Sequence, residues 1–187
     1  SKPRYIWIDA AANFPDFANS KENIARDLAL AKDAGFTDIV VDVRPTTGDV
    51  LFKTNIVDQV KFMYAWIGSN YTKVERTATW DYLQAFVDEA RKQGLRIHAA
   101  INTFVGGNQI DGGTGLLYRD QSKAEWATQM NMQTGIVSVM NTSESTKFFN
   151  PAHPEVQTFL CDLLKDLASY DLDGIFLDRG RFLNLQT

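Results

Sequence analysis

The segment DGIFLDRGRF, residues 173–182, places an acidic side chain directly after a short apolar run. Asp178 is followed closely by Arg179 and Arg181, and nearby cations favour the ionised form of a carboxyl group. An ionised carboxylate suits a nucleophile or an electrostatic stabiliser, whereas a general acid needs a raised pKa. The alternative is a surface ion pair at the end of a strand. We predict that Asp178 is a catalytic carboxylate and that both arginines contact the substrate.

Polar side chains recur at a matching position in three other apolar runs. Because side chains alternate between the two faces of a strand, residues two or four apart share a face. Asp42 therefore shares a face with Arg44, and His98 with Asn102, while Asp9 ends a third run. Simpler explanations are an Asp-Arg ion pair, a core histidine and an asparagine that closes a turn. Agreement among four runs favours one polar cluster that binds substrate, made of Asp9, Asp42, Arg44, His98 and Asn102.

Strand-like and helix-like patterns must position these residues, and they alternate along the chain. Such alternation is typical of βαβ units and a parallel sheet. The strand-like runs are short, apolar and rich in β-branched or aromatic residues, and they cover residues 4–10, 37–45, 95–102 and 172–178. Helices are expected after Asn19 or Ser20, after Thr79 and from Pro154 onward, with Cys161 buried in the third.

The connections between these elements are unequal in length. Helix-to-strand links are tight, whereas the strand-to-helix links cover residues 11–17, 46–78 and 103–153. In a parallel sheet these links gather at the carboxyl ends of the strands, where barrels and doubly wound sheets place their sites. A doubly wound sheet could close with four or five strands, but an eight-stranded barrel takes about 250 residues. We predict an α/β fold, a (β/α)8 TIM barrel of which residues 1–187 supply the first four βα units.

Composition argues against several classes of function. The chain has 187 residues, 44% of them hydrophobic, and a net charge of −4. It has no basic block for nucleic acid and no apolar run near the roughly 18 residues that span a bilayer. It also lacks the glycine-rich phosphate-binding motifs, and two histidines with one cysteine argue against a transition-metal site. We therefore expect no cofactor, no metal, no nucleic-acid partner and no membrane span.

Aromatic side chains are frequent in the long links. Such rings combine a flat apolar face with a polar edge, which makes them platforms for sugar rings. The alternative is that they only pack the links onto the sheet. Trp66 and Phe104 are the strongest candidates for contact with a carbohydrate substrate.

Three segments resemble the motifs of a known family. VDVRPTTGDVLFKT, residues 41–54, resembles the strand-two signature of the bacterial family-10-like glycosylhydrolases, a barrel family in the broad alpha-amylase-like grouping. GLRIHAAINTF resembles that family's G-x-x-x-HAW-x-NP-Y, and FFNPAHPEVQTFL with YDLDGIFLDRGRF resembles its approach to strand four. The residues at matching motif positions are Arg44, Asp49, His98, Asn102, Asp178 and Arg181, and we expect Asp49 to contact the substrate like the others. Departures from the pattern occur at Ala100, Thr103 and Arg179.

The resemblance implies a glycoside hydrolase-like barrel that acts on a poly- or oligosaccharide. In amylase-like barrels the strand-four aspartate is the nucleophile and the acid/base follows on strand five, which would lie beyond Thr187. We therefore expect residues 1–187 alone to be inactive and to need the remaining half of the barrel. Rival hypotheses are a non-catalytic carbohydrate-binding barrel and a small-molecule enzyme on a doubly wound sheet. We expect an extracytoplasmic location, with any export signal removed.

Overall fold

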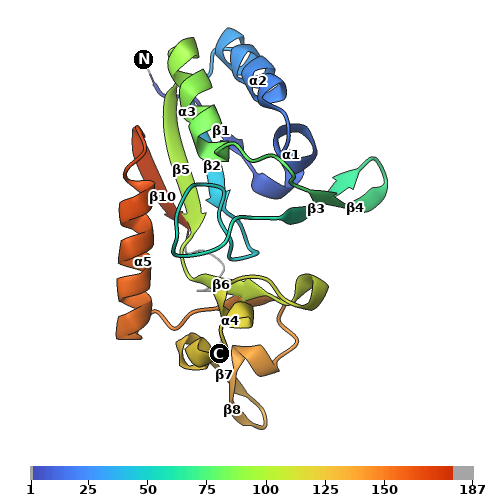
Figure 1. Ribbon diagram of the computed structural model, residues 1–187, viewed down its shortest axis with the longest axis vertical. Helices are drawn as coiled ribbons and strands as arrows, with labels where there is room; N and C mark the ends of the chain where they lie inside the picture. The colour runs from blue at the N-terminus through green and yellow to red at the C-terminus, as the bar shows by residue number, and fades with distance from the viewer. Residues whose placement is uncertain (1, 179–187) are drawn as a thin grey trace.

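A four-stranded parallel sheet forms the centre of the computed structural model, which describes residues 2–178 (Figure 1). The strands lie across it in chain order: β1 (Tyr5–Ile8), β2 (Asp38–Arg44), β5 (Arg96–Asn102) and β10 (Gly174–Asp178). They coincide with the four predicted runs. A doubly wound sheet reverses its strand order at a switch point. The described part of the sheet has no such reversal, which argues against the doubly wound hypothesis.

Three helices lie between the central strands where the sequence predicts them: α2 (Lys21–Asp33), α3 (Tyr82–Gln93) and α5 (Pro154–Leu167). Ser20 caps α2 by accepting a hydrogen bond from the Asn23 N–H at 3.1 Å. Asp81, and not Thr79, caps α3, because its carboxylate accepts from the Gln84 N–H at 3.2 Å. His153 caps α5, as its position before Pro154 suggests.

The structure has a helix, α1 (Ala10–Phe17), in a segment where the sequence analysis expects a loop. The sequence pattern of this helix is hard to recognise, because the helix has only eight residues and contains Pro15, and proline usually interrupts a helix. The carboxylate of Asp9 caps it by accepting from the Ala12 N–H at 2.7 Å. This helix therefore sets the position of Asp9 at the end of β1.

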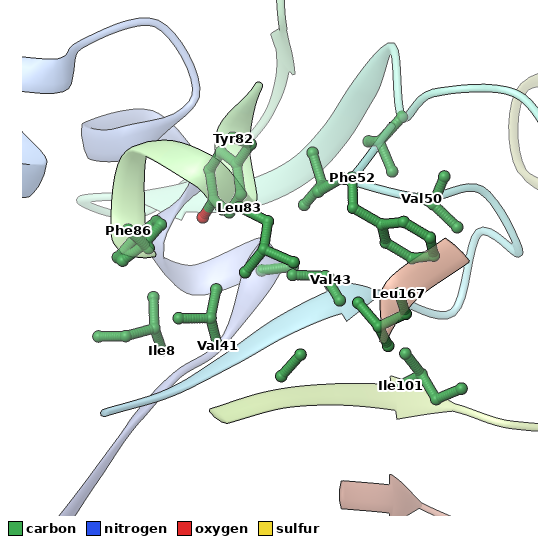
Figure 2. Packing of buried hydrophobic residues seen from close by; sticks show 14 of the residues in the cluster. Ile8, Val41, Val43, Val50, Phe52, Tyr82, Leu83, Phe86, Ile101 and Leu167 are labelled. Atoms are coloured by element: carbon green, nitrogen blue, oxygen red, sulfur yellow. The ribbon is translucent and has the colours of Figure 1, made fainter. Parts of the chain in front are cut away.

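The apolar stripes of the helices pack against one face of the sheet and form the core (Figure 2). Val41 of β2 lies against Leu83 of α3, and both side chains are fully buried. Cys161 does not share this burial: the expectation of a buried thiol is wrong, because α5 turns Leu160 and Leu163 inward and leaves Cys161 exposed.

The opposite face of the sheet is concave. Edge strands β1 and β10 are separated by three strand spacings, roughly 14 Å in a flat sheet. The ring centroids of Trp7 in β1 and Phe176 in β10 are nevertheless 5.4 Å apart, and those of Tyr5 and Phe176 are 6.3 Å apart. The sheet must therefore curl toward this face, as the wall of a barrel does. All three rings remain exposed, Trp7 by 58%.

The long links lie beyond the carboxyl ends of the strands and carry structure of their own (Figure 1). They contain the hairpin of β3 (Phe62–Ile67) and β4 (Asn70–Glu75), the pair of β6 (Val105–Asn108) and β9 (Thr146–Phe148), and the hairpin of β7 (Gln129–Met132) and β8 (Gly135–Ser138). The short helix α4 (Leu116–Arg119) lies among 3₁₀ turns at Ile110–Gly112, Gln121–Trp126 and Val139–Asn141. Among residues 2–178 no helix has the length and apolarity needed to cross a bilayer.

Candidate active site

A cavity of about 560 Å³ opens at the carboxyl ends of the central strands. We call it the acidic pocket because three carboxylates line it together with an amide and two rings: Asp9, Asp42, Asp178, Asn102, Trp7 and Phe176. Ala100 lies between them, and its small side chain leaves space at the centre. The structure thus brings together four of the residues that the sequence analysis selects, from all four strands.

Asp42 has the most strongly perturbed carboxyl group of the pocket. Burial is the largest cause and raises its pKa to about 7, with further upward contributions from the negative charges of Asp9 and Asp178. The backbone N–H groups of Arg44 and Ala10 donate to the carboxylate and offset only part of this shift, the first at 3.2 Å. Asp42 is therefore protonated in a large fraction of molecules at neutral pH.

Asp178 lies at the end of β10, directly beside Asn102 at the end of β5. The two residues are register partners in adjacent parallel strands, so their side chains leave the sheet on the same face. The Asp178 carbonyl accepts a hydrogen bond from the Thr103 N–H at 3.2 Å, which fastens the end of β10 to the chain after β5. The Asp178 side chain is exposed at the pocket.

Arg44 does not follow the predicted alternation. The register between β2 and β5 shifts between Asp42 and Arg44, so that Arg44 is opposite Ile101. Its side chain is 1% exposed, and its guanidinium donates to the carbonyls of Asn102, Thr103 and Val105. The prediction that Arg44 shares a face with Asp42 is wrong because a bulge adds a residue to β2. Arg44 holds the backbone after β5 in place instead of lining the acidic pocket.

Asn102 also binds Arg44 through its side chain, because its amide donates a hydrogen bond to the Arg44 carbonyl at 3.0 Å. A side-chain amide has two donor hydrogens and an acceptor oxygen, so one such bond leaves hydrogen-bonding capacity for a ligand hydroxyl. The bond also fixes the rotamer of Asn102 at the wall of the pocket.

His98 lies on the concave face but below the acidic pocket. Its partner in β10 is Gly174, the first residue of that strand. Its Nε2 is 2.7 Å from the Asp38 carboxylate, and its ring packs 5.5 Å from that of Phe176. Only 6% of the residue is exposed. The structure thus favours the alternative of a satisfied core histidine over the predicted substrate contact.

Asp49 lies apart from the acidic pocket, and its carboxylate is paired with the guanidinium of Arg119. Arg119 also contacts Asp58 at 3.1 Å. The three residues border a separate cavity of about 240 Å³. Burial raises the pKa of Asp49, and Arg119 opposes that shift. This geometry fits a structural ion pair better than the predicted contact with substrate.

The remaining predicted contacts are dispersed. Trp66 is 69% exposed on the hairpin β3–β4, and Phe104 is half-buried against the core, so neither lines the acidic pocket. Arg179 and Arg181 lie outside the described residues. Within residues 2–178 no three His, Cys, Asp or Glu side chains are grouped to hold a metal ion.

The sequence analysis did not select two residues that line the pocket, or a third, Tyr82, that is buried near its carboxyl groups. Trp7 and Phe176 line the pocket. They could have been predicted, because each lies two residues before Asp9 or Asp178 and therefore shares a face with it. Tyr82 could not be found in this way, because it belongs to α3. Its hydroxyl is buried without a hydrogen-bond partner among the described residues, and burial followed by the charge of Asp42 raises its pKa.

Comparison with known proteins gives related sequences and folds. Residues 2–183 match the model of the family described as glycosyl hydrolase-like 10. An S-layer-related protein of Niallia circulans is 30% identical over 185 residues, which are 96% of this chain. The chain spans only 11% of the length of that relative.

Solved structures share the fold at low sequence identity. A hypothetical protein from Ruminiclostridium thermocellum has a TM-score of 0.57 at 14% identity, over 94% of this chain and 75% of its own. Alpha-L-fucosidase isoenzyme 2 from Paenibacillus thiaminolyticus has a TM-score of 0.59 at 17% identity, and the match covers 95% of this chain and 23% of the fucosidase. An alpha-galactosidase from Thermus thermophilus has a TM-score of 0.54 at 14% identity, and the match covers 94% of this chain and 30% of the galactosidase.

These glycosidase neighbours are (β/α)8 barrel domains, and the parallel sheet of this chain superposes on part of each. The family match extends over nearly the whole chain, from β1 through the end of β10. The chain therefore belongs to the glycosyl hydrolase-like 10 family.

Proposed function

We propose that this chain forms the first half of a (β/α)8 barrel that hydrolyses glycosidic bonds in a poly- or oligosaccharide. The observation that carries the proposal is the acidic pocket, where carboxylates from three strands meet an amide and exposed rings at the carboxyl end of a curled parallel sheet. The family and the glycosidase neighbours support a carbohydrate-active function. The remaining strands of the barrel would come from sequence outside residues 1–187.

In this proposal Asp178 is the nucleophile or the stabilising carboxylate. Glycoside hydrolysis uses a pair of carboxyl groups: one protonates the departing oxygen, and the other attacks the anomeric carbon or activates water. Asp178 is exposed to the pocket and lies beside Asn102, whose amide would hold a sugar hydroxyl. The general acid would follow on the next strand of the barrel, beyond Thr187.

Asp42 would contribute a protonated carboxyl group. Its pKa of about 7 leaves a proton that can be donated to a substrate hydroxyl or ring oxygen. A neutral Asp42 also places no negative charge of its own beside the carboxyl groups of Asp9 and Asp178.

The test is Asp178→Asn in the full-length protein, with reducing-end release from a panel of polysaccharides as the readout. We expect at least a ~1,000-fold loss of turnover, because loss of an attacking or charge-stabilising carboxylate removes several kcal/mol of transition-state stabilisation. Stability should change little, since Asp178 is exposed.

The matched control is Asp171→Asn, which makes the same chemical change at an exposed carboxylate paired with Arg91. Its activity should remain within about twofold of wild type, because an exposed ion pair contributes little. Near-normal turnover by Asp178→Asn would exclude the nucleophile role, and glycan binding without any product release would favour a non-catalytic carbohydrate-binding barrel.

We further propose that the protein works outside the cytoplasm. The relative at 30% identity is an S-layer-related protein, which supports an extracytoplasmic setting for this chain as well.

A further inference from the structure

A second cavity adjoins the acidic pocket and follows the hairpin β3–β4. It measures about 550 Å³ and shares three lining residues with the acidic pocket: Ala11, Thr46 and Met63. Because the same residues border both cavities, the two lie next to each other, and a ligand chain that passes these residues would reach from one to the other. Each volume falls in the roughly 300–1,000 Å³ range of small-ligand sites, so the two cavities together offer more space than one such ligand fills. We call the second cavity the hairpin groove.

One wall of the hairpin groove is aromatic. The sequence FMYAWI of β3 places Phe62, Tyr64 and Trp66 on one face, while the residues between them are buried. The ring of Tyr64 stacks on that of Tyr71 at 5.3 Å and 23°, and the ring of Trp66 tilts against Tyr71 at 5.1 Å. Tyr71 is 57% exposed. Exposed rings such as those of Trp66 and Tyr71, beside the half-buried rings of Phe62 and Tyr64, are a feature of binding surfaces.

The facing wall is polar and carries no ionisable side chain. Asn108, Gln109 and Ser145 line it. The Gln109 side chain donates to the Ser145 hydroxyl at 3.3 Å, and its backbone N–H donates to the Ser145 carbonyl at 2.9 Å. Amides and hydroxyls of this kind have further donors and acceptors to offer. The wall therefore suits a neutral ligand with many hydroxyl groups.

Asp111 joins the hairpin to the loop that carries the polar wall. Its carboxylate accepts from the Tyr64 hydroxyl at 2.9 Å and pairs with Lys73 at 2.9 Å. Asp111 has a φ of 52°, a left-handed conformation that non-glycine residues rarely adopt. These contacts hold the two walls at a set separation, so the groove exists before a ligand arrives.

We propose that the hairpin groove binds the sugar units of a glycan chain that continue from the two units held in the acidic pocket. A pyranose ring presents C–H groups on its faces and hydroxyls at its edge, which match the rings of Tyr64 and Tyr71 and the polar wall. The inference rests on the proposed function and deepens it: the substrate is a chain of several sugars, and the enzyme distinguishes long from short chains through Tyr71.

The test uses the full-length protein with Asp178→Asn to prevent turnover. Titration calorimetry measures binding of di- and hexasaccharides from cellulose, chitin, amylose and xylan. Tyr71→Ala in this background should weaken binding of the preferred hexasaccharide by about tenfold, the effect of losing one ring-stacking contact. Binding of the disaccharide with the same linkage should change by less than about twofold, because that ligand fits within the acidic pocket.

Two variants guard against a merely structural effect. Tyr71→Phe keeps the ring and should bind the hexasaccharide within about threefold of the parent. Ile136→Ala removes a side chain that is 68% exposed on the separate hairpin β7–β8, and should leave binding unchanged. Equal losses for both chain lengths, no loss with Tyr71→Ala, or no hexasaccharide binding by the parent would each overturn the proposal.

The outcomes separate this inference from the proposed hydrolysis. If the wild-type protein binds hexasaccharides through Tyr71 but releases no product, the hairpin groove stands and hydrolysis fails. If the wild-type protein releases product, but the ratio of kcat/KM for hexa- and disaccharide is the same in Tyr71→Ala, hydrolysis stands and the hairpin groove fails.

Discussion

The ionised form of the Asp42 carboxyl group destabilises the folded protein. Burial and two neighbouring carboxylates raise its pKa from 3.8 to about 7. In the unfolded chain the group would titrate near its ordinary value of about 3.9. Between these two values the folded state holds a proton that the unfolded state has lost. The contribution of Asp42 to stability therefore falls as the pH rises from about 4 to about 7, and it stays unfavourable above that.

Asp42→Asn should remove this pH dependence, because asparagine has the shape of a protonated aspartate and no charge. One pKa unit corresponds to about 1.4 kcal/mol, so we expect a gain of roughly 2 kcal/mol in the free energy of unfolding at pH 8, after allowing for water in the pocket. At pH 4 the variant and the wild type should be equally stable. Urea unfolding at the two pH values measures this, and an equal effect at both would contradict a titration of Asp42.

At the scale of elements, glycines let three chain segments cross beside the acidic pocket. A Cβ atom at Gly115 would lie 2.6 Å from the Gly107 Cα and 2.9 Å from the Thr47 carbonyl oxygen. The Thr114 hydroxyl donates to the same carbonyl at 2.7 Å. Because these contacts involve backbone, which cannot move aside cheaply, only glycine fits. The crossing fixes the link after β2, from which Thr46 lines both cavities.

Gly115→Ala should therefore destabilise the protein by about 3 kcal/mol or more, through steric overlap added to the cost of positive φ. Gly112 provides a control with the same φ of 83°, at which a Cβ would meet nothing within 4 Å. Gly112→Ala should cost only the roughly 1–2 kcal/mol of the backbone conformation. Chemical denaturation distinguishes the two, and similar losses would mean that the crossing can relax.

At the scale of the whole molecule, the concave face of the sheet exposes an aromatic cluster made of Tyr5, Trp7 and Phe176. The helices pack on the other face of the sheet, so the two faces differ in how much of their apolar surface is exposed. In a closed barrel, side chains from the remaining strands would cover the lower part of the concave face. We therefore expect the remaining strands to cover part of this cluster, while Trp7 and Phe176 keep one edge at the acidic pocket.

The fluorescence of Trp7 measures how far the remaining strands cover the cluster. Acrylamide quenching of wild type and of Trp7→Phe isolates the contribution of this tryptophan. It should be quenched readily in residues 1–187, where the side chain is 58% exposed, and several-fold more slowly in the full-length protein. Equal quenching in both proteins would mean that the rest of the protein leaves the concave face open.

The sequence by itself determined the four central strands, the three helices between them and the main part of the acidic pocket. Apolar runs located the four strands, and the two-residue alternation within a strand is local geometry that holds before any tertiary contact forms. It therefore placed Asp9, Asp42, Asn102 and Asp178 on one face, and the lengths of the links indicated which end of the sheet holds the site.

Only the tertiary structure decided what the other candidates do. The bulge in β2 depends on its pairing with β5, and it takes Arg44 out of the alternation. The partner of Asp49 is 70 residues away, and that of His98 is 60 residues away, so neither pair can be read from local spacing. The raised pKa of Asp42 likewise arises from burial by distant segments, because desolvation is a property of the packed chain and not of a motif. The hairpin groove adjoins the acidic pocket only because distant segments pack side by side.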